Sequence, residues 1–127
     1  MHILLSTILG VGIMLGGGPD KPNWVCSCVE QNDSHYVAPL KVEGRDSVIR
    51  RLSSIVQSLP RTTITEEDAG QLRAECRSRF FGFVDDLHCV YDEEANVVHI
   101  RSASRSGYYD FGVNRKRVET IRGLWAP

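Results

Sequence analysis

The stretch VDDLHCVYDEEANVVHIRSA, residues 84–103, predicts an antiparallel β-hairpin. Its two halves, residues 84–91 and 97–103, alternate apolar with polar side chains over much of their length, which is typical of strands with one buried face. Between them, residues 92–96 (DEEAN) are mostly polar and suit a turn. The remaining elements are placed outward from this hairpin.

The register of the hairpin follows from its apolar residues. With residues 92–96 as a five-residue connection, we expect Cys89 opposite Val98 and Leu87 opposite Ile100, because apolar side chains then share one face. A slip of one residue would move every side chain to the opposite face. The same register pairs Asp85 with Ser102, Asp86 with Arg101, and His88 with His99.

Two more strands precede the hairpin. Residues 62–65 are all β-branched, residues 66–70 form a turn, and residues 72–76 alternate apolar with charged side chains. Residues 36–42 fit a short edge strand, and the polar residues 19–35 are expected to be an extended leader.

Two helices enclose these strands in the sequence. Apolar residues recur at helical spacing in residues 48–59, and Pro60 ends this helix. A second helix is expected at residues 113–124, with an inward stripe formed by Asn114, Val118, Ile121 and Trp125. The order helix, four strands, helix predicts an α+β fold, a four-stranded antiparallel sheet with two helices packed on one face.

The N-terminus has the composition of a targeting segment. Residues 3–15 are free of charge and mostly apolar, and small residues follow them. This run is shorter than the ~20 residues that a membrane-spanning helix needs. We expect residues 1–20 to be a signal peptide or an N-terminal anchor, the alternative being a buried strand or helix. Residues 21–127 are expected to form a single domain.

The overall composition argues against nucleic-acid binding. The 127 residues carry a net charge of −1, whereas non-specific binding to phosphates needs an excess of Lys and Arg. Four cysteines are compatible with an oxidising compartment.

Several ordered segments together resemble the family called domain of unknown function 1499. They are PN at 22–23, PL at 39–40, LPRT at 59–62, FGFVDD at 81–86, RSASR at 101–105 and GYYDFGVNRKR at 107–117. The resemblance covers about residues 21–124, and it implies a fold and an exported or membrane-associated location but no reaction. Trp24 stands where the family usually has a cysteine, so the resemblance carries no cysteine role to this chain.

The strongest candidate site lies where the hairpin meets the start of the last helix. A helix N-terminus presents free N–H groups that favour an anion, and arginine adds a bidentate donor for carboxylate or phosphate. The cluster is either a pocket for a small anion or acidic head group, or an internal network in which carboxylates neutralise the arginines. Its members are Asp85, Asp86, Arg101, Ser102, Ser104, Arg105, Asp110, Asn114 and Arg115.

Histidine and cysteine suggest two further arrangements. His88 and His99, directly opposite each other, could hold zinc or copper with a third ligand.

The cysteines fall into two pairs. Cys26 and Cys28 are too close in sequence for an easy mutual bond. Cys76 and Cys89 lie on neighbouring strands with both side chains inward, either as free core thiols or as a disulfide.

No motif in the chain specifies a reaction. We therefore expect a non-enzymatic binding or accessory module without a cofactor, located in the periplasm, in the thylakoid lumen or at a membrane. Its expected partner is a small anionic ligand, a membrane protein or a membrane surface. One alternative is a hydrolase of an anionic or ester substrate that uses Asp85 with Ser102 or Ser104. Another is a structural partner of a membrane complex.

Overall fold

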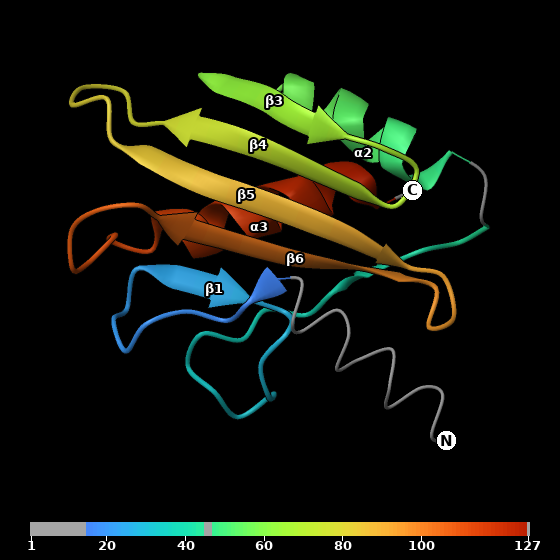
Figure 1. The fold of residues 1–127 in the computed structure, drawn as a ribbon, viewed down its shortest axis with the longest axis horizontal. Coiled ribbons are helices and arrows are strands. Elements are labelled where there is room, and N and C mark those ends of the chain that lie inside the picture. The colour runs from blue at the N-terminus through green and yellow to red at the C-terminus, as the bar shows by residue number, and fades with distance from the viewer. Residues whose placement is uncertain (1–14, 45–46, 127) are drawn as a thin grey trace.

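The computed structural model describes residues 15–44 and 47–126 and forms one α+β body (Figure 1). The elements in chain order are β1 (Trp24–Cys26), β2 (Leu40–Lys41), α2 (Val48–Gln57), β3 (Thr62–Glu67), β4 (Gln71–Arg77), β5 (Val84–Asp92), β6 (Val97–Ser104) and α3 (Val113–Trp125). The strand order is β1-β6-β5-β4-β3, β2 pairs with β6, and all of these pairings are antiparallel.

The sheet has six strands, so the prediction of four is wrong. The additional strands, β1 and β2, are three and two residues long, and both pair with β6; β2 lies within the short edge strand expected at residues 36–42, whereas β1 was not predicted. All three residues of β1 are buried, so this strand lacks the alternation that marks a strand in a sequence. β1 lies within the segment that was expected to be an extended leader.

The predicted register of the central hairpin is wrong by two residues. Cys89 pairs with Ile100 and Leu87 with Ser102, because the ladder extends to a pair between Asp92 and Val97 and leaves a four-residue connection. A shift of two keeps every side chain on its predicted face. The separation of the hairpin into an apolar and a polar face therefore stands.

The main core lies between the helices and one face of the sheet. Leu52 and Val56 of α2, Val118 and Ile121 of α3, and Ile100 of β6 are fully buried in one apolar cluster. Figure 1 shows both helices behind the sheet. Burial of one such side chain stabilises the fold by roughly 1.5–3 kcal/mol.

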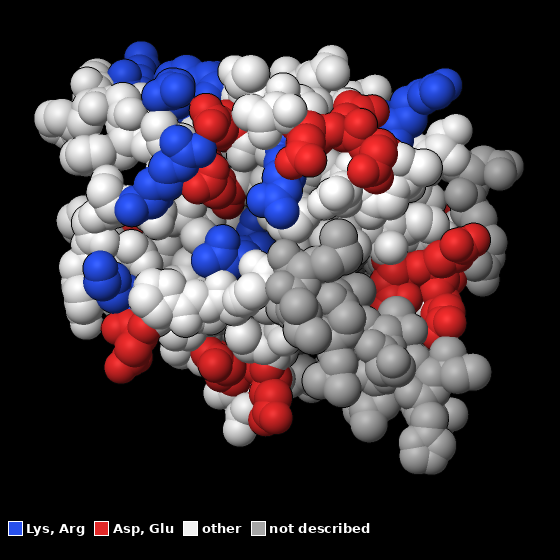
Figure 2. All heavy atoms as spheres, viewed as in Figure 1, with Lys and Arg blue, Asp and Glu red and all other residues white. Residues whose placement is uncertain are grey.

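A smaller apolar cluster covers part of the opposite face, which we call the open face. Trp24 of β1 and Leu15, which precedes that strand, pack there with Val90 and Ala103. The rest of this face is charged, and Figure 2 shows basic and acidic side chains interspersed over it.

The described residues include no helix that is both long and apolar enough to cross a bilayer. Most of the apolar run predicted at residues 3–15 lies outside the described residues.

Candidate functional site

The nine predicted site residues do not form one site. Adjacent residues of a strand point to opposite faces, so Asp85 faces the helices while Asp86 faces the open side. Ser102 shares the face of Asp85, and Arg101 shares the face of Asp86. The expected single cluster is therefore divided into a network under α3 and a group of charges on the open face.

Asn114 is the centre of the network under α3. Its side chain is fully buried, and its Oδ1 accepts hydrogen bonds from Ser102 Oγ at 2.8 Å and from Arg117 Nη1 at 2.9 Å. Its Nδ2 donates to Asp110 Oδ2 at 2.8 Å, Ser104 Oγ at 3.0 Å and the Asn23 carbonyl oxygen at 3.1 Å. The first turn of α3 is thereby joined to β6 and to the residue before β1.

Arg117 completes this network, although it was not among the predicted site residues. Its Nη2 lies 2.9 Å from Asp85 Oδ2, and both side chains are mostly buried. Arg117 follows Asn114 by three residues, which places both on one side of a helix. That spacing is the signal that could have identified it.

The network is built to hold elements together. The Ser102 hydroxyl donates to Asn114, and Asp85 is paired with Arg117. The three described histidines lie elsewhere: His88 and His99 on the open face, and His35 beside Trp24. Arg115 lies apart from the network, where it donates to the carbonyl oxygens of Ser34 and Tyr36.

On the open face, Arg105 forms a bidentate ion pair. Its Nε and Nη2 each lie 2.8 Å from one carboxylate oxygen of Asp86, and Nη2 also lies 2.7 Å from Glu75 Oε2. Hydrogen bonds from these two carboxylates raise the pKa of the Arg105 guanidinium. Because the group is about half exposed, the pair contributes little to stability.

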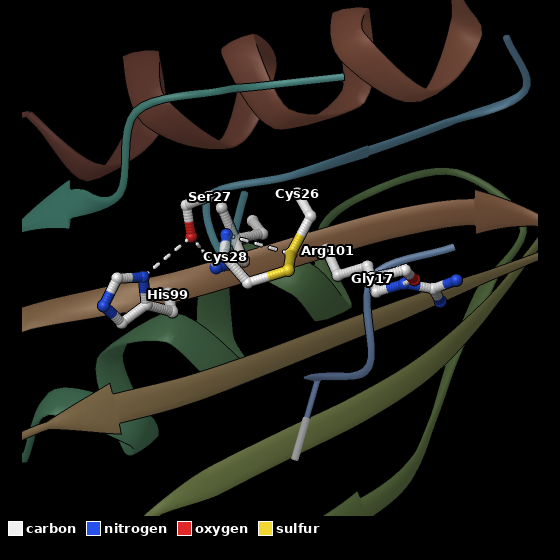
Figure 3. The surroundings of a disulfide bond; sticks show 7 residues. Gly17, Cys26, Ser27, Cys28, His99 and Arg101 are labelled. Carbon is white, nitrogen blue, oxygen red and sulfur yellow. Dashed lines mark hydrogen bonds between the residues drawn. A yellow bond between two sulfur atoms is a disulfide. The ribbon is translucent and has the colours of Figure 1, made fainter. Parts of the chain in front are cut away.

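Arg101 lies beside this pair in a different environment. Its Nε donates to the Gly17 carbonyl oxygen at 2.6 Å (Figure 3). Its guanidinium lies over the Trp24 ring at 5.9 Å. Burial lowers the pKa of Arg101, and the nearby Asp86 opposes that shift. Within the described part of the chain, Arg101 forms no ion pair with a carboxylate.

These arginines line a pocket of about 340 Å³ on the open face. Arg73, Arg101 and Arg105 contribute three positive charges, and Glu75 and Asp86 contribute two negative ones. His88, Thr65 and Leu15 are also part of the lining. Arg73 and Glu75, both from β4, were not among the predicted site residues. The alternation of residues in this strand places both on the open face, and that pattern could have identified them.

Over residues 15–124, the sequence matches the family described as "Protein of unknown function (DUF1499)". The chain belongs to this family. The family resemblance predicted from the sequence is confirmed. The match includes residues 15–20, which belong to the segment expected to be a signal peptide or anchor. None of the curated proteins compared with this DUF1499 chain matches it.

The two strand histidines of this DUF1499 protein are not directly opposite each other. His88 pairs with Arg101, and His99 pairs with Val90. His88 Nε2 lies 2.9 Å from Gln71 Oε1, and His99 Nδ1 lies 3.0 Å from Ser27 Oγ. Among the described residues, no three His, Cys, Asp or Glu side chains are grouped as metal ligands.

Burial gives His88 an unusual protonation behaviour. Desolvation, together with the positive charges of Arg73 and Arg101, lowers the pKa of His88 to about 4. His88 is therefore neutral near pH 7. Burial also lowers the pKa of His99, against the opposing charge of Asp92.

The cysteine pairing differs from the expectation for one pair. Cys26 and Cys28 form a disulfide despite their separation of two residues (Figure 3). Cys76 and Cys89 are free and buried, because Cys76 pairs with Asp85, four positions away from Cys89. Burial raises the pKa of both thiols.

Reduction of the Cys26–Cys28 disulfide is expected to lower the free energy of unfolding by only roughly 1.5 kcal/mol. A bond between residues two apart closes a very short loop, so it restricts the unfolded chain little. Urea unfolding with and without a phosphine reductant measures the difference, and a variant with Cys26→Ser and Cys28→Ser serves as the control. A loss above about 3 kcal/mol would show that the bond anchors the N-terminal segment.

Proposed function

We propose that this protein is a non-enzymatic binding module that holds a small anion in the open-face pocket beside Arg101. The observation that carries the proposal is a half-buried guanidinium without a carboxylate partner among the described residues. Withdrawing a cation from water is costly unless a negative charge compensates it. A bound anion would supply that charge.

The other groups of the pocket suit the same ligand class. Arg73 lies 3.2 Å from Glu66 and Arg105 pairs with Glu75 and Asp86, so the positive charge left for an anion is that of Arg101. Arg73 and Arg101 flank His88 on either side in the strand register. Guanidinium groups bind carboxylate and phosphate with two parallel hydrogen bonds. The volume of about 340 Å³ suits a phosphate or carboxylate group rather than a large substrate.

An extracytoplasmic location is part of this proposal. The apolar run at residues 3–15 is typical of an export signal or anchor. The Cys26–Cys28 disulfide supports the same location, because disulfides persist mainly in oxidising compartments.

Inorganic phosphate is the probe for this pocket. We expect Arg101→Gln to weaken phosphate binding about tenfold or more, because the variant loses the charged donor. Arg101→Lys keeps the charge without the bidentate geometry and is expected to bind with intermediate affinity. Isothermal titration calorimetry measures the three affinities, and thermal unfolding checks that each variant is folded.

The matched control is Arg50→Gln, which removes an exposed arginine of α2 that does not line this pocket. It should leave phosphate affinity unchanged. Two results would each refute the proposal: no phosphate binding by the unmodified protein, or equal binding by the protein and its Arg101→Gln variant.

A further inference from the structure

Two loops lie side by side at one end of the sheet. The loop at residues 78–83 joins β4 to β5, and the loop at residues 105–112 joins β6 to α3. Arg77 pairs with Val84, and the Arg105 N–H donates to the Val84 carbonyl oxygen at 3.0 Å. The end of the first loop and the start of the second therefore both lie beside Val84, the first residue of β5. Both lie at the left of Figure 1.

Each loop exposes three aromatic side chains. Their exposed fractions are Phe80 81%, Phe81 79%, Phe83 58%, Tyr108 66%, Tyr109 57% and Phe111 85%. Within each loop the rings contact each other, with centroids 5.8 Å apart for Phe81 and Phe83 and 4.9 Å apart for Tyr109 and Phe111. Such a concentration of exposed aromatic area at one end of a domain marks an interaction surface.

Hydrogen bonds hold both loops in shape. The Phe83 N–H donates to Ser78 Oγ at 2.9 Å, and the Ser78 N–H donates to the Phe83 carbonyl oxygen at 2.8 Å. In the other loop, Asp110 Oδ1 accepts the Gly112 N–H at 2.8 Å, so this hydrogen bond joins the residues on either side of Phe111. The aromatic tips are therefore displayed by ordered turns.

Basic side chains lie next to these tips. A groove of about 390 Å³ is lined by Arg61, Arg77, Lys116 and Arg117, together with Val113 near the second loop, and none of its lining residues is acidic. Arg117 is neutralised by Asp85, which leaves three basic side chains at the surface of the groove, of which Arg77 forms an exposed ion pair with Glu75 at 3.5 Å. A fourth, Arg79, lies over the Phe80 ring at 5.4 Å.

We infer that this end of the molecule docks on a lipid bilayer that carries anionic head groups. Phenylalanine favours the boundary of the acyl chains, and tyrosine favours the interface, where its hydroxyl stays in water. The adjacent basic groove matches the negative surface of such a bilayer. A membrane accounts for both features, since the apolar rings are on loop tips that are able to enter it while the basic groups stay at phosphate level.

The inference is independent of the open-face pocket. None of the six aromatic side chains lines that pocket, and Arg101 does not line the basic groove. The two proposals can therefore fail separately.

Tryptophan fluorescence, taken as the difference between each variant and the unmodified protein with its native Trp24 and Trp125, tests the docking in the full chain. Phe81→Trp and Phe111→Trp are each mixed with vesicles of phosphatidylcholine and phosphatidylglycerol, with and without brominated acyl chains. We expect a blue shift and quenching by the brominated lipid at both positions. The control is Leu124→Trp, an exposed position eleven residues further along α3 than Val113 and roughly 16 Å from it, which should be neither shifted nor quenched.

The positions that are quenched separate this docking from membrane binding through the apolar residues 3–15. Binding through those residues would not favour quenching at positions 81 and 111. Vesicles that leave both tryptophans unshifted and unquenched, or that quench Leu124→Trp equally, would overturn the inference, and a protein partner would then explain the aromatic loops better.

The contribution of the groove is tested with Arg61→Gln combined with Lys116→Gln in the Phe81→Trp background. We expect vesicle partitioning through this end to weaken on the order of 20-fold at low salt. Unchanged partitioning would contradict the basic part of the surface. Arg101→Gln should leave the quenching unchanged, so a failed phosphate pocket is distinguishable from a failed membrane surface.

Discussion

Replacement of Asn114 by alanine is expected to lower the free energy of unfolding by about 3 kcal/mol. The fully buried amide of Asn114 satisfies groups on β6, on α3, in the loop before α3 and before β1, and alanine cannot take over any of these hydrogen bonds. Ser102 would lose its acceptor, and Arg117 would lose one of its two neutral partners. For a domain of this size the melting temperature should fall on the order of 15 °C.

The matched control is Thr120→Ala, an exposed position on the same helix. It should change the free energy of unfolding by no more than about 0.5 kcal/mol. Urea unfolding of both variants measures the difference. If Asn114→Ala lost less than about 1 kcal/mol, the network would not be the connection between α3 and the sheet that its geometry indicates.

The faces of the central hairpin could be predicted from the sequence, but the register could not. The alternation of apolar and polar residues determines which side chains face the core, and a shift of two residues does not change it. The exact pairing depends on the connection, where Asp92 Oδ1 accepts the Ala95 N–H and Asn96 adopts a left-handed conformation. Such local turn chemistry has no counterpart in the apolar pattern.

The candidate site was only partly predictable for a related reason. The sequence correctly pointed to Asn114 as a polar residue on an inward helical stripe, and the structure gives it five hydrogen-bonded partners. The alternation of strand residues already separates Asp85 from Asp86, so one shared cluster was not compatible with the predicted strand. Arg117 was missed because a charged residue on a helix is usually solvated, and its partner Asp85 is distant in sequence.

Acidification is expected to destabilise the protein through His88, by about 2.5 kcal/mol between pH 7 and pH 4.5. The pKa of His88 is about 4 in the folded protein and about 6.5 in the unfolded chain. Between these values the unfolded chain binds a proton that the folded protein rejects, so stability falls as the pH falls. The loss begins near pH 6.5 and levels off below about pH 4.

The physical cause can be tested by His88→Gln, whose amide can still donate to Gln71 but does not titrate. Urea unfolding at pH 7 and pH 4.5 should show a distinctly flatter pH dependence for the variant, with a remainder from His99, whose pKa is also lowered by burial. An equal loss of stability in both proteins would contradict the assignment to His88.

Because protonation of His88 would place a third positive charge between Arg73 and Arg101, an anion bound beside Arg101 should reduce the loss of stability in the unmodified protein. Phosphate that protects the unmodified protein at pH 4.5 but not its Arg101→Gln variant would therefore connect the titration of His88 to the proposed pocket.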